Sequence, residues 1–391
     1  IGDAPRGERA RVHVARRRAG AILRAVLASA MLCPRCHRTY PSEEKHCGYD
    51  GAELTDARRV DIIAARQTRH LGAVIGGRYA IRGFIGQGGT ARVYLVEDLV
   101  SAEPAALKLL DPPWSQDRVA RERFAREAEA ARAIEHPNVV QIHHVGMRSN
   151  GTPYLVMEYL HGESLASLLA REGRLGVDIA LPVFASVAEA LVAAHASGVL
   201  HRDLKPDNIF LVGEPGEPYG VKVVDFGLAK LRDATITAAG TAIGTAAFMS
   251  PEQCVADEAD ARSDVYGLGM TMFQVLTGRL PFEADAPEDL LAHNLLSEPV
   301  APSSLVPELG AELDAVVRKC LRKDPARRYA SMSELAGALD AMLQERRPEA
   351  GAEELDASDD HYTPKTPFSV LVAKALRKRL AAQAPDTASP R

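Results

Sequence analysis

A glycine-rich turn between two strand-like segments constrains this sequence more than any other feature. Residues 79–85 alternate in the manner of a β-strand, and a second strand-like segment follows at 93–96. The glycines between them allow bare backbone N–H groups to approach phosphate oxygens. A dinucleotide-binding turn and a Walker loop both need a helix at this point, so the sequence excludes both. It predicts a phosphate-binding hairpin, although glycine-rich hairpins are common and other residues must support this interpretation.

A lysine within an apolar strand is the second signal. Residues 105–110 are apolar except for Lys108. An ammonium group is costly in such surroundings unless it is paired. The helical segment 121–134 offers Glu127 as a partner. The alternative is an ordinary lysine on a solvated sheet edge.

Two short polar runs carry the chemistry. The sequence HRDLKPDN occupies residues 201–208, and DFG occupies residues 225–227. Together with the glycine-rich hairpin, the strand lysine and the helix glutamate, in this order and spacing, they resemble the protein kinase superfamily. The resemblance covers residues 78–343 and is strongest to the bacterial Ser/Thr kinases of eukaryotic type.

The resemblance implies an α+β fold with two lobes. A small β-rich N-lobe with one helix is expected over residues 78–160, and a larger helical C-lobe over residues 161–345. The segment 265–277 is expected to be a buried apolar helix. Glu252, in a motif that replaces the family's Ala-Pro-Glu by Ser-Pro-Glu, is expected to pair with Arg328.

The resemblance also implies roles in transfer of the ATP γ-phosphate, where catalysis is mainly positioning and charge stabilisation. Lys108, oriented by Glu127, would hold the α- and β-phosphates. Asp203 would accept the proton of the substrate hydroxyl. Lys205 would contact the γ-phosphate.

A divalent cation, Mg2+ or Mn2+, would be held by Asp225 and Asn208 in the same scheme. Ala91 stands at the third glycine position of the hairpin, from which we expect at most a modest loss of ATP affinity. The nucleotide contacts implied by the resemblance lie in the hairpin, the apolar walls around adenine and the hinge: Ile85, Gly86, Gly88, Gly89, Val93, Ala106, Met157, Glu158, Leu160, Phe210 and Val224.

The acceptor is expected to be a Ser or Thr hydroxyl of a protein. Lys205 stands where Ser/Thr kinases have a lysine, and Thr245 matches a threonine that contacts Asp203 and Lys205 in them. Arg202 precedes the catalytic aspartate and offers a positive charge to a phosphate. Autophosphorylation is therefore expected on one or more threonines of the activation segment: Thr235, Thr237 and Thr241.

A cysteine cluster near the front predicts a small zinc-ribbon-like module at residues 31–54. Cys33 and Cys36 form a CxxC knuckle, and Cys47 begins a second one. The fourth ligand would be Asp50, His46 or His37. Without metal, a piece this small should be unfolded. The alternative is a metal-free remnant of such a ribbon.

The ends of the chain differ from its centre. Residues 1–30 contain seven Arg and carry a charge of +5 within a chain of -5. We expect them to be a non-native upstream extension or a disordered leader, because Met31 directly precedes the cysteine cluster. Residues 55–77 are expected to be a linker, and 346–391 a flexible tail. Residues 369–382 predict a short basic amphipathic helix, either merely solvated or in weak contact with a membrane or an acidic partner.

The expected function is that of an active cytoplasmic protein Ser/Thr kinase in bacterial signalling, with dimerisation as a route to trans-autophosphorylation. The alternative is a kinase-like scaffold, or pseudokinase, that binds partners through its zinc module. The intact charged positions favour the enzyme. The mildly acidic composition gives no nucleic-acid signal, and no segment reaches the roughly 18 uncharged apolar residues of a membrane-spanning helix.

Overall fold

The computed structural model describes residues 72–213, 220–226, 246–284 and 286–346, with short pieces at 30–32, 39–41, 45 and 55–56. The chain divides into two compact units. Unit 1 comprises Ile1–Asp111 and Gly146–Tyr154, and unit 2 comprises Pro112–Val145 and Leu155–Arg391. Each is described by itself below.

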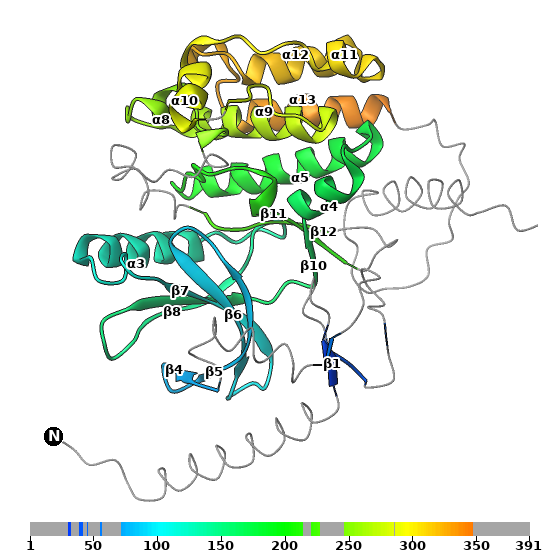
Figure 1. The fold of residues 1–391 in the computed structure, drawn as a ribbon. Coiled ribbons are helices and arrows are strands. Elements are labelled where there is room, and N and C mark those ends of the chain that lie inside the picture. Colours follow the sequence, from blue (N-terminus) through cyan, green and yellow to red (C-terminus); the bar gives the residue numbers. More distant parts are fainter. Residues whose placement is uncertain are drawn as a thin grey trace, which may run out of the picture. The chain divides into compact units, whose positions relative to one another are not determined.

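Unit 1 is built on an antiparallel sheet. Its strands are β4 (Val74–Ile75), β5 (Tyr79–Gln87), β6 (Ala91–Asp98) and β7 (Pro104–Leu110), paired in chain order (Figure 1). The hairpin predicted from the glycines is therefore confirmed, as is the strand around Lys108. Register shifts in β5 at Ile81/Gly83 and Phe84/Gly86 mark bulges where the glycines begin.

Strands β8 (Ile142–Met147) and β9 (Pro153–Glu158) run through the boundary of the units. They complete a six-stranded sheet in the order β4-β5-β6-β7-β9-β8. In the turn between them, Arg148 N donates to Thr152 O over 2.9 Å. The end of β9 leads into the segment that the sequence assigned to the hinge.

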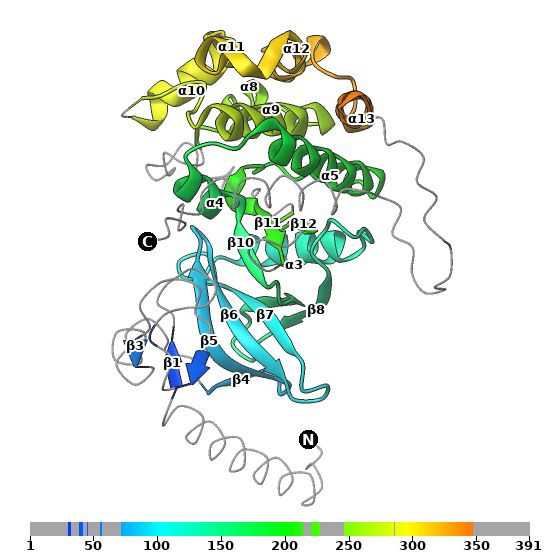
Figure 2. The same cartoon turned by 90° about the vertical axis from the view of Figure 1, so that its right-hand side faces the viewer.

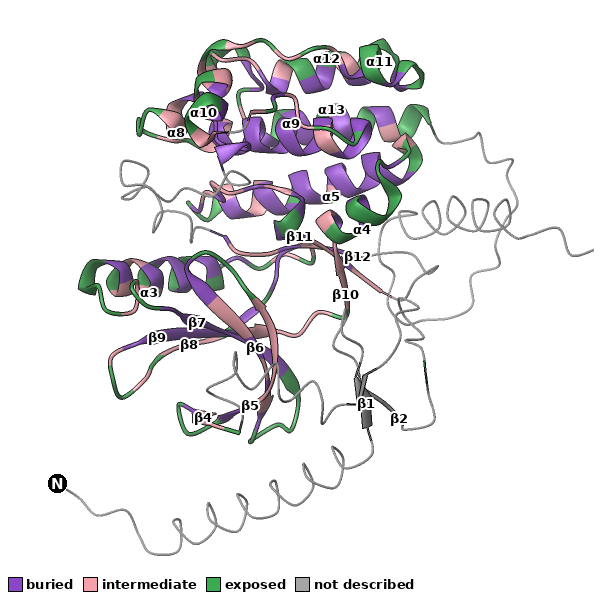
Figure 3. Cartoon of the chain, in the orientation of Figure 1, coloured by how far each residue is buried: buried purple, intermediate pink, exposed green. Residues whose placement is uncertain are grey.

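The core of unit 2 is a stack of helices around α5 (Val177–Ala196) and α9 (Ala261–Thr277), which are buried along most of their length (Figure 3). The predicted buried helix at 265–277 is thus confirmed. Within the described residues, α5 is the one helix long and apolar enough to span a bilayer, but 67% of its apolar stretch is buried inside the protein. Its apolarity is that of a core helix.

Other helices pack around this stack (Figures 1 and 2). Asp117 caps α3 by accepting from Val119 N and Ala120 N, and Gly278 ends α9 with a left-handed φ of 75°. The surrounding helices are α4 (Leu165–Glu172), α8 (Pro251–Cys254), α10 (Pro287–Leu296), α11 (Pro302–Leu305), α12 (Gly310–Cys320) and α13 (Met332–Glu345), and unit 2 also contains α3 (Arg118–Arg132).

A small antiparallel sheet lies against this helical core. It consists of β10 (Gly162–Ser164), β11 (Ile209–Val212) and β12 (Gly220–Val223), with β11 in the middle. The 3-10 turn η1 (Pro206–Asn208) leads directly into β11. Because Ile209 at the start of β11 pairs with Val223 at the end of β12, the two polar runs of the sequence leave this β-ribbon at the same end.

Three short strands precede the main sheet of unit 1. They are β1 (Ala30–Leu32), β2 (Thr39–Pro41) and β3 (Thr55–Asp56), paired antiparallel in the order β2-β1-β3. Leu32 pairs with Thr39. The predicted zinc ligands, Cys33, Cys36, Cys47 and Asp50, lie outside the described residues, as do 1–29 and the predicted tail helix at 369–382.

Candidate active site

A buried carboxylate at the start of α9 forms the base of the site. Asp264 is 1% exposed and accepts hydrogen bonds from the backbone N–H groups of His201 (2.8 Å) and Arg202 (2.7 Å). A ring nitrogen of His195 lies 2.7 Å from the same carboxylate. Burial raises the pKa of Asp264, but the contacts with His195 and the Arg202 N–H outweigh it, so the pKa lies below its ordinary value. The ionised carboxylate therefore ties the loop to the helical core.

The loop brings together three of the predicted catalytic side chains. Lys205 Nζ lies 3.0 and 2.9 Å from the two carboxylate oxygens of Asp203. Asn208 Nδ2 donates to the Asp203 carbonyl over 2.7 Å. The side chains of Lys205 and Asp203 are 13% and 14% exposed, so the pair is partly desolvated but still reachable. An acceptor for a proton and a cation for a phosphate thus stand side by side.

Asp225 is held in an unusual backbone conformation next to this loop. Its φ is 66°, in the left-handed region that non-glycine residues rarely occupy. On one side, Val224 N donates to Asn208 O over 2.9 Å. On the other, the ring of Phe226 packs edge-on against His201 with centroids 4.9 Å apart. These contacts fix the direction in which the Asp225 carboxylate leaves the chain.

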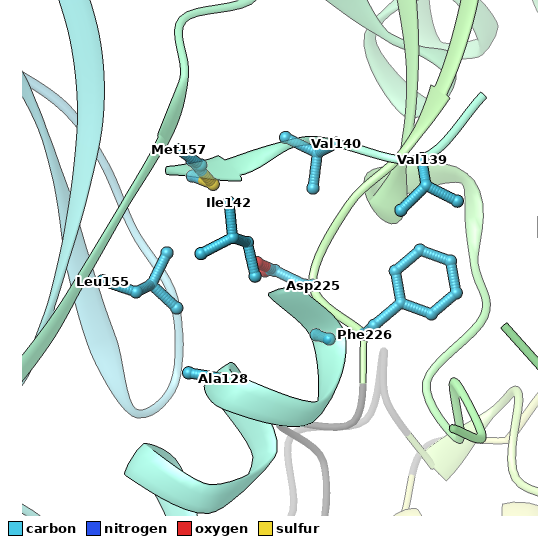
Figure 4. Close-up of a pocket in the computed structure, with 9 residues that line it drawn as sticks. Ala128, Val139, Val140, Ile142, Leu155, Met157, Asp225 and Phe226 are labelled. Atoms are coloured by element: carbon cyan, nitrogen blue, oxygen red, sulfur yellow. The ribbon is translucent and has the colours of Figure 1, made fainter. Parts of the chain in front are cut away.

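A small cavity of about 10 Å3 lies beside Asp225, among side chains of α3, β8 and β9. In Figure 4 the Asp225 side chain lies among apolar groups, including those of Ile142, Leu155 and Met157. This volume is at the lower limit for a single water molecule. The nine lining residues are Ala128, Ala131, Val139, Val140, Ile142, Leu155, Met157, Asp225 and Phe226.

Asp225 and Asn208 fit the Mg2+ that the sequence implies. The Asn208 amide nitrogen is used in the bond to the Asp203 carbonyl, so its oxygen is the atom left for a cation. A carboxylate and an amide oxygen are hard donors, and Mg2+ usually takes one or two such ligands together with substrate phosphates. Among the described residues, no cluster of three or more His, Cys, Asp or Glu side chains forms a self-sufficient metal site.

The hinge segment is braced by a lysine that the sequence did not single out. Lys222 Nζ lies 2.6 Å from Glu158 Oε1 and 3.2 Å from the Val139 carbonyl. The same carboxylate oxygen accepts from Gln141 N over 2.7 Å, and Glu158 N donates to Gln141 O over 2.9 Å. The Glu158 backbone N–H and side chain are therefore used within the protein. The backbone carbonyl of Glu158 is therefore the group of this residue that can contact the edge of an adenine ring.

The glycine-rich hairpin of unit 1 leaves open space over its backbone. A Cβ added at Gly86 would meet nothing within 4 Å, and one at Gly88 would meet only the Ala91 carbonyl at 3.7 Å. Packing within unit 1 thus does not require glycine here, whereas the close approach of a ligand would. On β7, Lys108 is only 7% exposed.

Glu127, the predicted partner of Lys108, lies on α3 in unit 2 and is 9% exposed. The two side chains belong to different units, so their pairing stays a prediction. The same holds for an adenine pocket that would combine residues of both units. Ile85, Val93 and Ala106 lie in unit 1, whereas Met157, Leu160, Phe210 and Val224 lie in unit 2.

The Ser-Pro-Glu segment is linked to the catalytic loop and to the end of the domain. Ser250 caps α8 in a reciprocal capping box with Gln253. Gln253 Nε2 also donates to the Arg202 carbonyl over 2.8 Å. Glu252 pairs with Arg328 through two bonds of 2.7 and 2.8 Å, which confirms the predicted ion pair.

No sequence pattern indicated the contacts that His195, Lys222 and Gln253 make with residues distant in the chain. Gln253 does lie in a short motif, the Ser-x-x-Gln capping box with Ser250, but that motif indicates the start of a helix and not the contact with Arg202. Several predicted residues of the activation segment lie outside the described residues, namely Thr235, Thr237, Thr241 and Thr245.

Comparison with known proteins agrees with this geometry. A family model described as protein kinase domain matches residues 79–338. The chain belongs to the protein kinase family. Its relatives include serine/threonine-protein kinase pkn3 of Myxococcus xanthus, 36% identical over 285 residues, which are 71% of this chain and 52% of that protein. Serine/threonine-protein kinase PknB of Mycobacterium tuberculosis is 37% identical over 279 residues, 70% of this chain and 44% of that protein.

Solved structures confirm the kinase fold. The crystal structure of the Mycobacterium tuberculosis PknI kinase domain aligns with a TM-score of 0.57 at 28% identity, covering 70% of this chain and 98% of that one. The chain spans about half the length of the curated relatives it matches. The kinase domain, with a sheet unit and a helical unit, is thus the part that the relatives share.

Proposed function

We propose that this chain is a protein Ser/Thr kinase that transfers the γ-phosphate of ATP to Ser or Thr hydroxyls of proteins. The observation that carries the proposal is the constellation of Asp203, Lys205 and Asn208 on one loop, tied to the core through Asp264. The printed names of the relatives support the same reaction. A pseudokinase would not need to keep these charged groups in mutual contact.

Each residue of the site has a separate role in the proposed phosphate transfer. Asp203 accepts a hydrogen bond from the acceptor hydroxyl and takes its proton as the hydroxyl oxygen attacks the γ-phosphorus of ATP, while the bond from that phosphorus to the bridging oxygen breaks and ADP leaves. Lys205 offsets negative charge on the transferring phosphate, and its contact with Asp203 sets both groups at one place. Asp225 and Asn208 would hold Mg2+, which when bound supplies positive charge to the phosphates.

The test is transfer of labelled phosphate from ATP to a generic protein substrate. Asp203→Asn keeps the shape of the side chain but removes the base, so we expect a rate about 100- to 10,000-fold lower. Asp207→Asn is the matched control, because Asp207 is exposed on the same loop and should change the rate less than about twofold. Full activity of Asp203→Asn would refute the assignment. ATP binding without transfer in the unmodified protein would favour the scaffold.

Regulation and setting are part of the same proposal. Autophosphorylation is proposed on the activation segment, at Thr235, Thr237 or Thr241, with dimers as the trans-acting form. Peptide mass spectrometry of protein made with active and Asp203→Asn enzyme would test it, and phosphate present equally in both would contradict it. A reducing, cytoplasmic setting is supported by Cys254 and Cys320, which are free thiols.

We also propose that residues 31–54 hold one structural zinc ion through Cys33, Cys36, Cys47 and Asp50. The proposal is supported by the antiparallel pairing of β1 with β2, in which Leu32 and Thr39, the residues on either side of the CxxC sequence, are partners. Elemental analysis of the purified chain should find about one zinc per protein and much less in Cys36→Ser. Equal zinc in both would overturn the proposal.

A further inference from the structure

A short stretch after the middle of α12 holds six cations and a single acid. Over residues 318–328 the cations are Arg318, Lys319, Arg322, Lys323, Arg327 and Arg328, and the acid is Asp324. The structure uses two of the cations inside the protein. Arg328 pairs with Glu252, and Lys323 Nζ donates to the Asn294 carbonyl over 2.7 Å at the end of α10.

The other four cations face a common hollow of about 450 Å3 on the surface of unit 2. We call this hollow the basic pocket. It is lined by Ala315, Arg318, Lys319, Arg322 and Arg327, so no acidic side chain contributes to its wall. A convergence of this kind produces a local positive potential in a molecule whose net charge is negative.

The positive charge of the basic pocket is only partly compensated. Lys319 pairs with Glu334 over 2.7 Å, and Arg322 reaches Glu298 only at 3.9 Å. Within the described residues, neither Arg318 nor Arg327 forms an ion pair, and both are exposed. Two exposed guanidinium groups therefore remain available to a ligand, with a lysine and a further arginine beside them.

Stabilisation of α12 alone does not account for this arrangement. Cations in the last turn of a helix interact favourably with its dipole, which explains Arg318 and Lys319. Arg322 and Arg327 lie beyond the end of α12 at Cys320, and Arg327 belongs to the separate turn η3 (Pro325–Arg327). The gathering of all four around one hollow suits the binding of an anion rather than the capping of a helix.

We propose that the basic pocket binds the acidic segment 349–360 of the same chain. This segment has six carboxylates, at Glu349, Glu353, Glu354, Asp356, Asp359 and Asp360, and no Lys, Arg or His. The guanidinium group of arginine and a carboxylate form paired, charge-assisted hydrogen bonds. The charges of the two partners are therefore complementary in sign and similar in number.

The acidic segment is tethered close enough to reach the basic pocket. Glu334, which contacts Lys319, lies near the start of α13, and the helix ends at Glu345. At about 1.5 Å per residue, this stretch of helix is roughly 16 Å long. The residues from 346 to 352 can span about 23 Å when extended. A short tether of this kind gives an effective concentration in the millimolar range, enough to favour even a weak contact.

The test uses the full chain and a fluorescent peptide of residues 347–362. In one variant the six carboxylates are neutralised by Glu→Gln and Asp→Asn changes, so that the basic pocket is left open. At low salt we expect the peptide to bind this variant about tenfold more tightly than the unmodified chain, whose own segment competes. The difference should vanish at 0.5 M salt, because exposed charge pairs are screened.

Two further variants locate the site. Adding Arg318→Gln and Arg327→Gln to the neutralised chain should weaken peptide binding about tenfold, while Arg118→Gln, an exposed cation on α3, should have no such effect. Equal binding to the unmodified and neutralised chains would overturn the proposal, as would binding that survives loss of the two arginines. A dimer of the unmodified chain that those two changes dissolve would also overturn it, because the segment would then come from a second copy.

Discussion

Arg328→Met is the most informative single change for the stability of the helical unit. The Arg328 side chain is 0% exposed, and all five of its N–H donors are used. Two of them meet the Glu252 carboxylate. The remaining three meet the backbone carbonyls of Arg262 (2.9 Å), Arg322 (2.7 Å) and Lys323 (3.0 Å). Methionine fills a similar volume but leaves these acceptors without their donors.

The expected magnitude follows from what is left behind. The Glu252 side chain is only 10% exposed and would keep Ser263 Oγ, at 2.6 Å, as its remaining side-chain donor. Removal of one partner of a buried pair typically costs about 3–5 kcal/mol. For a domain of this size, each kcal/mol lowers the melting temperature by about 2–4 °C, so we expect a fall of roughly 6–20 °C.

The pH dependence of stability offers a second test of the pair of Glu252 and Arg328. Burial raises the pKa of Glu252, but the hydrogen bonds from Arg328 and Ser263 outweigh it, and the net shift is downward. A carboxyl whose pKa is lower in the folded state stabilises the fold above its unfolded pKa, about 4.5. This contribution disappears as the pH falls through the folded pKa. The stability gap between the unmodified protein and Glu252→Gln should therefore narrow in acid.

The assay is thermal and urea unfolding followed by circular dichroism at neutral pH. Arg118→Gln is the control, because the pair of Arg118 and Glu122 is 75% and 62% exposed and should contribute less than about 1 kcal/mol. A loss of stability in Arg328→Met no larger than in this control would refute the reasoning. It would mean that the five hydrogen bonds of the buried guanidinium are replaced by water or by rearrangement.

Two other changes test the hinge and the helix packing. Lys222→Met removes the ion pair that holds Glu158, so KM for ATP should rise about fivefold while kcat stays nearly unchanged. Lys222→Arg should restore the original KM. A fall in kcat alone would contradict a positioning role for Lys222. In Gly269→Ala the new Cβ would lie 2.6 Å from the Cβ of Cys320, so urea unfolding should show a loss of about 1–3 kcal/mol. Gly337→Ala, whose Cβ meets nothing within 4 Å, should instead stabilise α13 by about 0.5–1 kcal/mol; equal effects would refute the packing argument.

The parts that sequence could predict are those encoded in short runs. The hairpin of β5 and β6 follows from alternation and glycines, and the contact of Asp203 with Lys205 follows from residues two apart on one loop. The pair of Glu252 and Arg328 was also predictable, but only through the resemblance to a family, since the two residues are far apart in the chain.

Other features depend on contacts that no local pattern records. Lys222 looks like an ordinary polar residue on a strand, yet it meets Glu158 from another sheet strand. Gln253 looks like a residue in the first turn of α8, yet it holds the Arg202 carbonyl. The sequence likewise does not indicate which cations are used inside the protein and which line the basic pocket. Arg322 and Lys323 are adjacent in the chain, yet Arg322 lines the basic pocket and Lys323 contacts the end of α10.

The left-handed backbone at Arg202 and Asp225 limits how this domain can be stabilised by engineering. Both have a φ of 66°, and each such non-glycine residue stores roughly 1–2 kcal/mol of strain. Glycine at either position would relieve that strain, so a selection for heat resistance alone should favour it. The same substitutions would remove the charge next to Asp203, the proposed catalytic base, or the Asp225 carboxylate proposed to hold the cation. Thermal robustness and phosphate transfer therefore make opposing demands on these two positions.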